Sequence, residues 1–484
     1  MHNERVTMMT TMAYMRSTGR HVRRALVACS LAMATGCSID GILKSDELPP
    51  DVTDPAITKT PAGAVAAYHG LVEEFRGAFG GEVFGRSVTA IGGMLGDELQ
   101  LGSSSLGRDA VPVDARAMIE GVADADALGV YGKLQKARGQ ASQAIGLLTR
   151  YAPDQRAVTG HAYVLQAFSE IFLAELFCSG IPLSTLDYEG DYTLRPGSTT
   201  EEVYQHALAL LDTALLLVTD STRFVDLTRM AQARALLGLG DFAGAAAAAA
   251  AVPDGFSYSM PFLGGSSSTS RNFAFISLSL WSLSVADLEG VNGLNYRTSA
   301  DPRVTTTRTA TNQNGFGIFH PNKYLADGSS PIVLASAVEA RLIEAEAALA
   351  AGNGAWLAAV NALRTNGTFT TRPNATNPAV TDTLWNAGSG GVAQLAPLAD
   401  PGTPEARVDL LFRERAFWLF LTGHRHADLR RLVRHYGRND FSVYPSGAYP
   451  ALGGQSYGND VTIPIPPEER VSNPHFSGCI SRDA

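Results

Sequence analysis

The sequence is short of charged residues and lacks the motifs that mark common enzymes. Only 18% of its 484 residues are charged while 45% are hydrophobic, which is typical of globular rather than disordered chains. The zinc-protease pattern H-E-x-x-H, the serine-hydrolase pattern G-x-S-x-G and the phosphate-binding P-loop do not occur in it. The chain therefore lacks the usual signatures of three large enzyme classes.

No hydrophobic run reaches the length of about 20 residues that a bilayer-spanning helix needs. The apolar residues 25–35 (ALVACSLAMAT) follow four arginines within Arg16–Arg24, which predicts a cleaved signal peptide over residues 1–36. The segment ends in Ala-Thr-Gly-Cys, which resembles a bacterial lipobox, so Cys37 is the expected acylated N-terminus. Several acyl chains would anchor it stably. The alternative is an ordinary signal peptide followed by an incidental cysteine.

Basic residues are fewer than acidic ones. Removal of residues 1–36, which hold five arginines and one glutamate, leaves 33 basic against 46 acidic residues and a net charge of −13. An acidic surface repels phosphate backbones, so nucleic acid is not expected as a partner. Residues 37–60 are polar and rich in Asp and Pro, which predicts a tether between the lipid anchor and the folded body.

Cysteine is scarce, with only Cys29, Cys37, Cys178 and Cys479 in the chain. The first would leave with the signal peptide and the second would carry lipid. Cys178 and Cys479 then remain as one even pair in an exported protein, and we expect them to be bonded. Closing a loop of about 300 residues would restrict the conformations of the unfolded chain, which would stabilise the fold by about 4–5 kcal/mol. The alternative is two separate buried thiols.

Residues 61–484 are predicted to form one mainly α-helical domain. Helical periodicity covers residues 61–75, 114–151, 154–177 and 198–218, with apolar positions recurring on one face. Asp154 is a candidate N-cap, and Ser198 and Glu201 have the three-residue spacing of a capping box.

Two segments repeat a pattern of helix, glycine-containing turn and helix. They are MAQARALLGLGDFAGAAAAAAAVP (230–253) and AVEARLIEAEAALAAGNGAWLAAVNALR (337–364). Alanines stand where the two helices would touch, and such small residues let the backbones approach closely. The pattern is typical of tetratricopeptide-type hairpins. The alternative is generic antiparallel helix packing without a true repeat.

Three loop-rich insertions interrupt this helical pattern, near residues 254–330, 367–402 and 435–475. The first carries clusters of Gly, Ser, Thr and Asn, with short β-like runs such as 273–280. Loops longer than about 15 residues are usually functional or disordered, so the insertions are candidates for a functional surface.

Several segments resemble, in order along the chain, the motifs of the SusD/RagB family. They are 160–184 (GHAYVLQAFSEIFLAELFCSGIPLS), Asp301-Pro302-Arg303, 337–364, 412–432 (FRERAFWLFLTGHRHADLRRL) and 463–474 (IPIPPEERVSNP). Within 412–432 the resemblance rests on Glu414, Arg415, Gly423, Arg425, Asp428, Leu429 and Arg430. The chain departs from the family pattern in its cysteine pair and in Leu421-Thr422, which stands where a glutamate would precede Gly423.

The resemblance implies a mainly α, tetratricopeptide-like fold with loop-rich insertions and minor β structure. It also implies a lipoprotein of the outer membrane, facing the cell exterior, that lies as a lid on a SusC-like, TonB-dependent transporter. Such a protein captures a nutrient, either an oligosaccharide or a peptide, and passes it to the transporter. The helices would largely face the transporter and the insertions would form the binding surface. This is a binding role, not an enzymatic one, and no cofactor is implied.

The charged residues of 412–432 admit a catalytic or a structural interpretation. Arg425 and Asp428 stand three apart on a helix and are expected to pair. We interpret them, together with Glu414, Arg415 and Arg430, as a partly buried ion-pair network that ties the last helix to its neighbours.

The histidines of this region do not favour a metal site. His424 and His426 stand two apart and would point to different faces of a helix, and His435 lies further along. A His-x-His pair chelates poorly on a helix, so we expect no metal.

Exposed aromatic and amide side chains of the first insertion are the candidate ligand contacts. Sugar rings present C–H faces that pack on aromatic platforms, while sugar hydroxyls need polar partners. The candidates are Trp281, Asn295, Tyr296, Phe316, Phe319 and Tyr324. For each of them the alternative is a local core position within the insertion.

Two other functions stay open at this point. A tetratricopeptide-type scaffold would bind proteins without small-molecule cargo. A pull-down from solubilised outer membrane would then recover other partners but never a TonB-dependent barrel. A glycoside hydrolase would use paired carboxylates, which sequence alone does not reveal, and it would release sugar on prolonged incubation.

Overall fold

Helices and short two-stranded sheets make up the part of the chain that the structure describes. The computed structural model describes residues 55–81, 86–102, 110–121, 125–265, 267–275, 283–312, 315–365, 369–373, 381–385, 395–449 and 455–484. The predicted signal peptide, Cys37 and most of the predicted tether lie outside these ranges. Residues 58–484 form one compact unit, and of residues 1–57 only 55–57 are described, at the start of helix α3.

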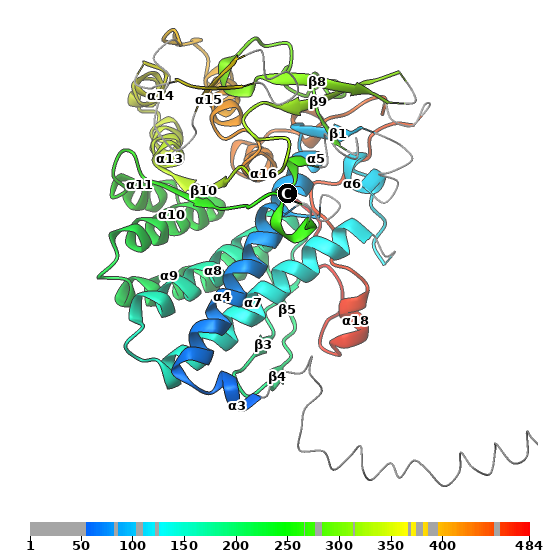
Figure 1. The fold of residues 1–484 in the computed structure, drawn as a ribbon. Helices are drawn as coiled ribbons and strands as arrows, with labels where there is room; N and C mark the ends of the chain where they lie inside the picture. Colours follow the sequence, from blue (N-terminus) through cyan, green and yellow to red (C-terminus); the bar gives the residue numbers. More distant parts are fainter. Residues whose placement is uncertain are drawn as a thin grey trace, which may run out of the picture. The chain divides into compact units, whose positions relative to one another are not determined.

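The helices follow each other closely along the chain. They are α3 (Pro55–Thr58), α4 (Pro61–Gly80), α5 (Val88–Leu95), α6 (Val111–Asp114), α7 (Ala125–Tyr151), α8 (Arg156–Leu176), α9 (Thr200–Leu217), α10 (Thr222–Leu239), α11 (Phe242–Ala250), α13 (Ala337–Ala350), α14 (Ala355–Thr365), α15 (Pro404–Trp418), α16 (Arg425–Tyr436), α17 (Asp440–Val443) and α18 (Glu468–Ser472), with 3-10 helices η3 (Ser268–Ser270) and η4 (Pro302–Val304). From α7 to α14 each helix packs against the next, and α4 lies against α7 and α8 (Figure 1).

Aromatic rings and alanines hold the first layers of this stack together. Phe79 of α4 stacks on Phe172 of α8 with ring centroids 5.5 Å apart, and both side chains are buried. Helix α7 packs against both α4 and α8, and its Ala137, Ala141 and Ala144 are fully buried at helical spacing. Small side chains at these positions let three helices lie close enough for large rings to meet.

The two alanine-rich hairpins are confirmed. Helices α10 and α11 pack against each other, as do α13 and α14, and α11 also packs against α13. Gly240, at φ 79°, ends α10 in the left-handed conformation that glycine adopts without strain. The next residue, Asp241, then caps α11 by accepting a hydrogen bond from the backbone N–H of Gly244 at 2.9 Å. The two hairpins therefore form consecutive layers of one helical stack.

Two predicted helix caps are wrong by one residue. Helix α8 starts after Gln155 rather than Asp154, and no side chain caps it. The capping box before α9 consists of Thr199 and Glu202 rather than Ser198 and Glu201. Ser198 still belongs to a strand, in which it pairs with Ile181. The helix therefore begins one position later than the predicted capping box implies.

All six sheets of the described chain are antiparallel pairs. They are β1 (Leu99–Leu101) with β7 (Leu283–Val285), β2 (Ile181–Pro182) with β5 (Gly197–Ser198), β3 (Thr185–Leu186) with β4 (Tyr192–Thr193), β6 (Ser257–Met260) with β10 (Ile332–Ser336), β8 (Thr306–Thr311) with β9 (Gly317–Pro321), and β11 (Phe369–Pro373) with β12 (Thr381–Trp385). The β6–β10 pair brings together the two ends of the first insertion. The helical stack can therefore resume at α13 where it stopped after α11.

Most of the predicted β-like run 273–280 lies outside the described residues. Residues 273–275 form a turn followed by a helical residue pair, and 276–280 lie outside the described residues. Within the described chain, none of the helices combines the length and apolar character that crossing a bilayer requires.

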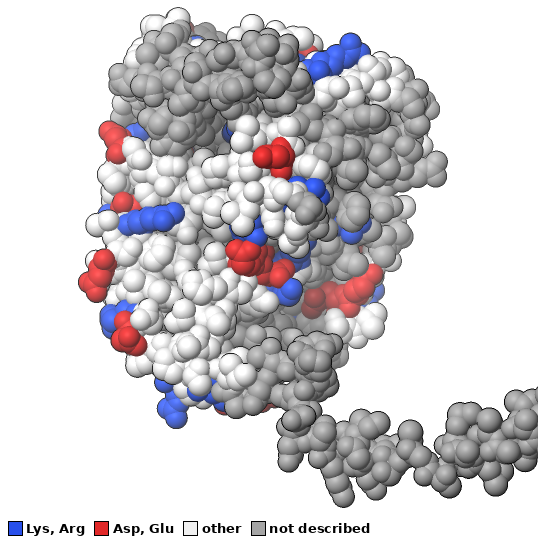
Figure 2. Space-filling model, in the orientation of Figure 1, with Lys and Arg blue, Asp and Glu red and all other residues white. Residues whose placement is uncertain are grey.

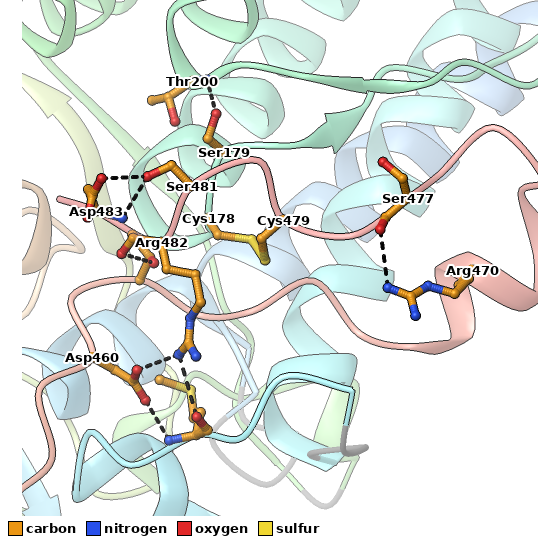
Figure 3. The surroundings of a disulfide bond; sticks show 12 residues. Cys178, Ser179, Thr200, Asp460, Arg470, Ser477, Cys479, Ser481, Arg482 and Asp483 are labelled. Carbon is orange, nitrogen blue, oxygen red and sulfur yellow. Dashed lines mark hydrogen bonds and ion pairs between the residues drawn. A yellow bond between two sulfur atoms is a disulfide. The ribbon is translucent and has the colours of Figure 1, made fainter.

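The predicted disulfide between Cys178 and Cys479 is present, with Cα atoms 5.8 Å apart across 301 residues of sequence. It joins the end of α8 to the last segment of the chain (Figure 3). Beside it, the backbone N–H of Ser179 donates to Ser481 O at 2.9 Å and that of Ile480 donates to Ser179 O at 2.7 Å. Residues 479–481 are thereby fixed to the helical stack by one covalent and two hydrogen bonds.

Candidate ligand-binding site

The charged residues of α15 and α16 form a buried ion-pair network, but the predicted pairing of Arg425 with Asp428 is wrong. Arg425 instead grips Asp97, just after α5, with Nε–Oδ1 and Nη2–Oδ2 distances of 2.6 and 2.9 Å. Asp428 is bound by Arg415 of α15 at 2.9 Å and by Arg431 at 2.8 Å. Arg415 and Arg431 thus occupy Asp428, and Arg425 instead links α16 to the segment that follows α5.

A second part of the network holds the first insertion on the helices. Arg303, in η4, donates to Glu414 of α15 at 2.6 Å and to Asp301 at 2.7 Å. Arg364, at the end of α14, donates to the other oxygen of Glu414 at 2.7 Å. Arg430 has another role, because it donates to backbone carbonyls at the end of α8, including Glu175 O at 2.8 Å. Most of these contacts join charged side chains to groups on other elements, and the structural role of the network stays a prediction.

The three histidines point to different neighbours. His424 contacts Glu339 at 3.0 Å, His435 lies near the carbonyl of Gly238, and His426 is buried. Burial lowers the pKa of His426, and nearby arginines act in the same direction. Within the described ranges no three His, Cys, Asp or Glu side chains are arranged to hold a metal ion.

Two of the predicted ligand contacts are wrong, because their side chains are buried. Tyr296 is 1% exposed, stacks on Phe420 at 5.0 Å and donates its hydroxyl to Asp97 at 3.1 Å. Tyr324 is 2% exposed and donates its hydroxyl to the carbonyl of Leu421 at 2.7 Å. Both rings serve to seat the first insertion on the loop between α15 and α16.

The other predicted contacts lie in three different situations. Asn295 is half-buried and accepts a hydrogen bond from Arg413 at 3.0 Å. Trp281 lies outside the described residues. Phe316 is 46% exposed at the turn of the β8–β9 hairpin, and Phe319 is half-buried on β9. Only the two phenylalanines are thus brought together on one hairpin.

Two arginines accompany these phenylalanines. The guanidinium carbon of Arg297 lies 4.1 Å from the ring centre of Phe319, and burial lowers the pKa of Arg297. Arg308 of β8 is exposed and stands opposite Phe319 in the strand register. We call Arg297, Arg308, Phe316 and Phe319 the hairpin face. It offers the exposed ring of Phe316 and the half-buried ring of Phe319, over which the Arg297 guanidinium lies.

Exposed apolar residues that the sequence analysis missed lie elsewhere in the insertions. Leu288, Val291 and Phe441 are 61%, 77% and 54% exposed. The side-chain amide of Asn292 joins their two segments, since it donates to Tyr444 O at 3.1 Å and to the carbonyl of Phe441. Single apolar residues in polar, aperiodic stretches give no sequence signal that separates exposed from buried positions.

A cleft of about 650 Å³ is lined by residues of three segments, within 433–440, 459–461 and 482–484. The first of these segments ends next to Phe441 in the sequence. We call this cavity the α16–α17 cleft. None of the predicted ligand contacts lines it. Three segments that are far apart in the sequence build it, so no local pattern could have identified it.

The drawn face of the molecule carries no broad field of one charge. Among the described residues of Figure 2, acidic and basic side chains are scattered over a mostly uncharged surface. The described residues drawn there form no extended basic patch of the kind that phosphate backbones require.

Comparison with known proteins places this architecture. No family model matches the chain, and no curated protein matches it in sequence. Solved structures do match, among them a SusD superfamily protein from Bacteroides fragilis, with 15% identity, a TM-score of 0.60, and coverage of 87% of this chain and 100% of that one. The chain has a SusD-like fold.

Two further SusD-like structures support this conclusion. A SusD-like carbohydrate binding protein from Bacteroides vulgatus has 13% identity and a TM-score of 0.57, and the match covers 86% of this chain and 97% of that one. A laminarin binding SusD-like protein has 14% identity and a TM-score of 0.58, with coverage of 87% and 99%. The SusD-like fold confirms the predicted mainly α, tetratricopeptide-like architecture.

Proposed function

We propose that this protein is an outer-membrane lipoprotein that captures a carbohydrate and passes it to a TonB-dependent transporter without chemical turnover. The observation that supports the proposal most is the SusD-like fold. The likeness extends over most of the chain to proteins described as carbohydrate binding, as laminarin binding and as a surface glycan-binding protein from Bacteroides uniformis. In this proposal Cys37 carries the lipid, and the body faces the cell exterior.

The hairpin face is the proposed contact surface for the glycan. Phe316 would receive the C–H face of a sugar ring, while Arg308 and Arg297, which lies over the ring of Phe319, would donate to hydroxyl or ring oxygens. Arginine and aromatic side chains together supply apolar area and directed donors, which is the usual division of work in a ligand site.

A binding screen with the mature chain tests the proposal directly. We expect reversible binding of one glycan class on an array of oligosaccharides, with no released sugar after prolonged incubation. Phe316→Ala should weaken that binding about tenfold, in line with a loss of roughly 1–1.5 kcal/mol of ring contact. Binding of peptides alone, or continuous release of sugar, would contradict the carbohydrate-capture role.

The membrane part of the proposal needs a second experiment. The full chain, solubilised gently from outer membrane, should co-purify with a β-barrel transporter, and Cys37→Ser should move the protein to the soluble fraction. Recovery of other proteins without any such barrel would favour a scaffold function instead.

A further inference from the structure

The α16–α17 cleft has the dimensions and the lining of a small-ligand site. Its volume of about 650 Å³ falls within the roughly 300–1,000 Å³ that is common for such sites. We infer that this cleft is a second saccharide-binding site, separate from the hairpin face, and that it accepts sugars without negative charge. The inference rests on the proposed carbohydrate cargo and adds the place and charge preference of a subsite.

The floor of the cleft is apolar. Val433 and Val461 line it and pack against a small core that includes Leu429 and Val443. Val461 is only 8% exposed, so the floor is fixed by packing. An apolar floor beneath polar walls suits a sugar ring, which has C–H groups on its faces and hydroxyls around its edge.

The walls carry polar groups that other residues do not use. The carboxylate of Asp440 and the side-chain amide of Asn459 have no hydrogen bond to any residue in the described ranges, and both residues line the cleft. Asn439 accepts from the backbone N–H of Phe441 at 2.9 Å through its oxygen, which leaves its amide N–H groups for a ligand. A sugar hydroxyl both donates and accepts, so it can satisfy a carboxylate and an amide at once.

The charges of the lining disfavour anions. Arg482 pairs with Asp460, and Arg438 pairs at 2.9 Å with Asp409, which lies outside the lining. The carboxylates of Asp440 and Asp483 are left without an ion-pair partner among the described residues. A uronic or sialic acid would place its carboxylate against these groups, and like charges at short range repel. Neutral and amino sugars meet no such barrier.

The disulfide positions one wall of the cleft. Figure 3 shows Cys479, Ser481, Arg482 and Asp483 along one segment, with Arg482 reaching Asp460 on the neighbouring loop. Arg482 O accepts from the hydroxyl of Thr462 at 2.9 Å. The wall is therefore held in place before a ligand arrives, which reduces the ordering cost of binding.

Calorimetric titration with defined trisaccharides tests the inference. The probes are cellotriose, maltotriose and laminaritriose as neutral sugars, the chitosan trimer as an amino sugar, and trigalacturonate as an acidic one. We expect at least one neutral or amino trimer to bind the mature chain, and the Asp440→Ala/Asn459→Ala double variant to weaken it at least tenfold. Both residues are on the surface wall, and circular dichroism with thermal unfolding verifies that the variant folds.

Tyr192→Phe, on a side chain that is 71% exposed and belongs to neither the cleft nor the hairpin face, is the control and should leave binding in the cleft unchanged. Strongest binding of trigalacturonate, no binding of any trimer, or unchanged affinity of the double variant would each overturn the inference. Glycan binding that Phe316→Ala weakens and the Asp440→Ala/Asn459→Ala variant leaves unchanged would support the proposed function while the second site fails. Absence of all glycan binding would instead defeat the proposed function itself.

Removal of the disulfide supplies an independent readout. The Cys178→Ser/Cys479→Ser variant, folded by the same criteria, should bind the cleft-specific trimer about three- to tenfold more weakly while its hairpin-face affinity is unchanged. An equal change at both surfaces, or none at the cleft, would contradict the role given to the 479–484 wall.

Discussion

The C-terminal helices and the insertions bury acidic side chains in opposite ways. On α16 the carboxylate of Asp428 lies between the guanidinium groups of Arg415 and Arg431, at 2.9 and 2.8 Å. Burial opposes the ionisation of Asp428, but the two cations outweigh it and hold the pKa of this carboxyl well below its usual range. The helices therefore bury ionised carboxylates together with their counter-charges.

Near the insertions, the buried carboxyl groups of Glu98, Asp114 and Glu289 accept hydrogen bonds from phenols or from a backbone N–H rather than from cations. Asp114 accepts from Tyr449 at 2.6 Å and Glu289 from Tyr457 at 2.9 Å. Burial raises the pKa of Asp114 to about 7 and that of Glu98 to about 8. Burial, reinforced by Asp114, also raises the pKa of Glu289. One oxygen of each group has no hydrogen-bond partner among the described residues.

Because of this difference, the contributions of the two regions to folding stability change with pH in opposite directions. A carboxyl group whose pKa is lowered by folding adds stability above its unfolded pKa, near 4, and loses that stability as the pH falls. A carboxyl group whose pKa is raised gives its stability below the unfolded pKa and loses it as the pH rises through the folded pKa. Acid should loosen the helices first, and a rise of the pH from about 5 to 8 the contacts of the insertions.

The largest expected effect is on the helical side. Asp428→Asn removes one of the two carboxylates that balance Arg415 and Arg431, which then keep only Glu346 among the described residues, and should lower the free energy of unfolding by about 3 kcal/mol at pH 7. Because the contribution of Asp428 is lost as the pH falls, the gap to the wild type should narrow below about pH 4. Urea denaturation at several pH values measures both quantities.

Asp400→Asn is the matched control, since Asp400 forms an exposed ion pair with Arg407 at 2.8 Å. Exposed pairs contribute about 1 kcal/mol or less, so this variant should lose little. Similar losses for the two variants would show that burial of the α15–α16 network does not set its strength.

A smaller effect of opposite sign is expected at Glu98. Asp97, Arg425 and Lys323 face this side chain, which accepts from the backbone N–H of Leu421 at 2.8 Å. Between about pH 5 and 8 the unfolded chain is ionised at this position while the folded chain keeps the proton, so stability falls with pH. Glu98→Gln removes this titration and should flatten the stability profile by about 1–3 kcal/mol over that window.

The measurement is the free energy of unfolding at pH 5, 6, 7 and 8, with the exposed Glu468→Gln as a control for the loss of one charge. A Glu98→Gln profile as steep as that of the wild type would mean that Glu98 does not hold its proton in the fold. The contrast between the two regions would then rest on Asp114 and Glu289 alone.

Sequence reasoning succeeded where the determining contacts are local. The α10–α11 and α13–α14 hairpins could be predicted because glycine turns and helical alanine spacing act within about 30 residues. The disulfide could be predicted because export leaves Cys178 and Cys479 as one even pair. Both inferences depend on chain-local chemistry or on counting, and neither needs the position of a distant neighbour.

Predictions from the sequence were wrong where the interacting residues lie far apart along the chain. Arg425 was assigned to Asp428, three residues away, but it binds Asp97, 328 residues away. Tyr296 and Tyr324 stand in aperiodic stretches, where nothing in the spacing tells an inward ring from an outward one. The α16–α17 cleft was missed for the same reason, because its three lining segments meet only in the folded chain.

The smallest expected effect concerns the phenols of the insertion side. Tyr457→Phe keeps the ring, which lies 5.1 Å from that of Tyr449, and deletes the donor to Glu289. A buried group that loses its hydrogen-bond partner costs about 1 kcal/mol or more. The loss should be greater at pH 8 than at pH 5, because an ionised carboxylate needs a donor more than a protonated carboxyl does.

Tyr192→Phe, on a side chain that is 71% exposed, is the control and should leave stability unchanged at both pH values. If Tyr457→Phe instead lost the same amount at pH 5 and pH 8, the hydroxyl would support Glu289 equally at both pH values, and the pH dependence of the insertion side would not arise from this hydrogen bond. A loss that grows with pH would show that the Tyr457–Glu289 hydrogen bond is the contact that responds to pH. Tyr457 is close in sequence to Asn459, Asp460 and Val461, which line the α16–α17 cleft. The pH at which the insertions loosen would then also be the pH at which the cleft loses its wall at Asn459 and Asp460, so cleft affinity and local stability should decline together.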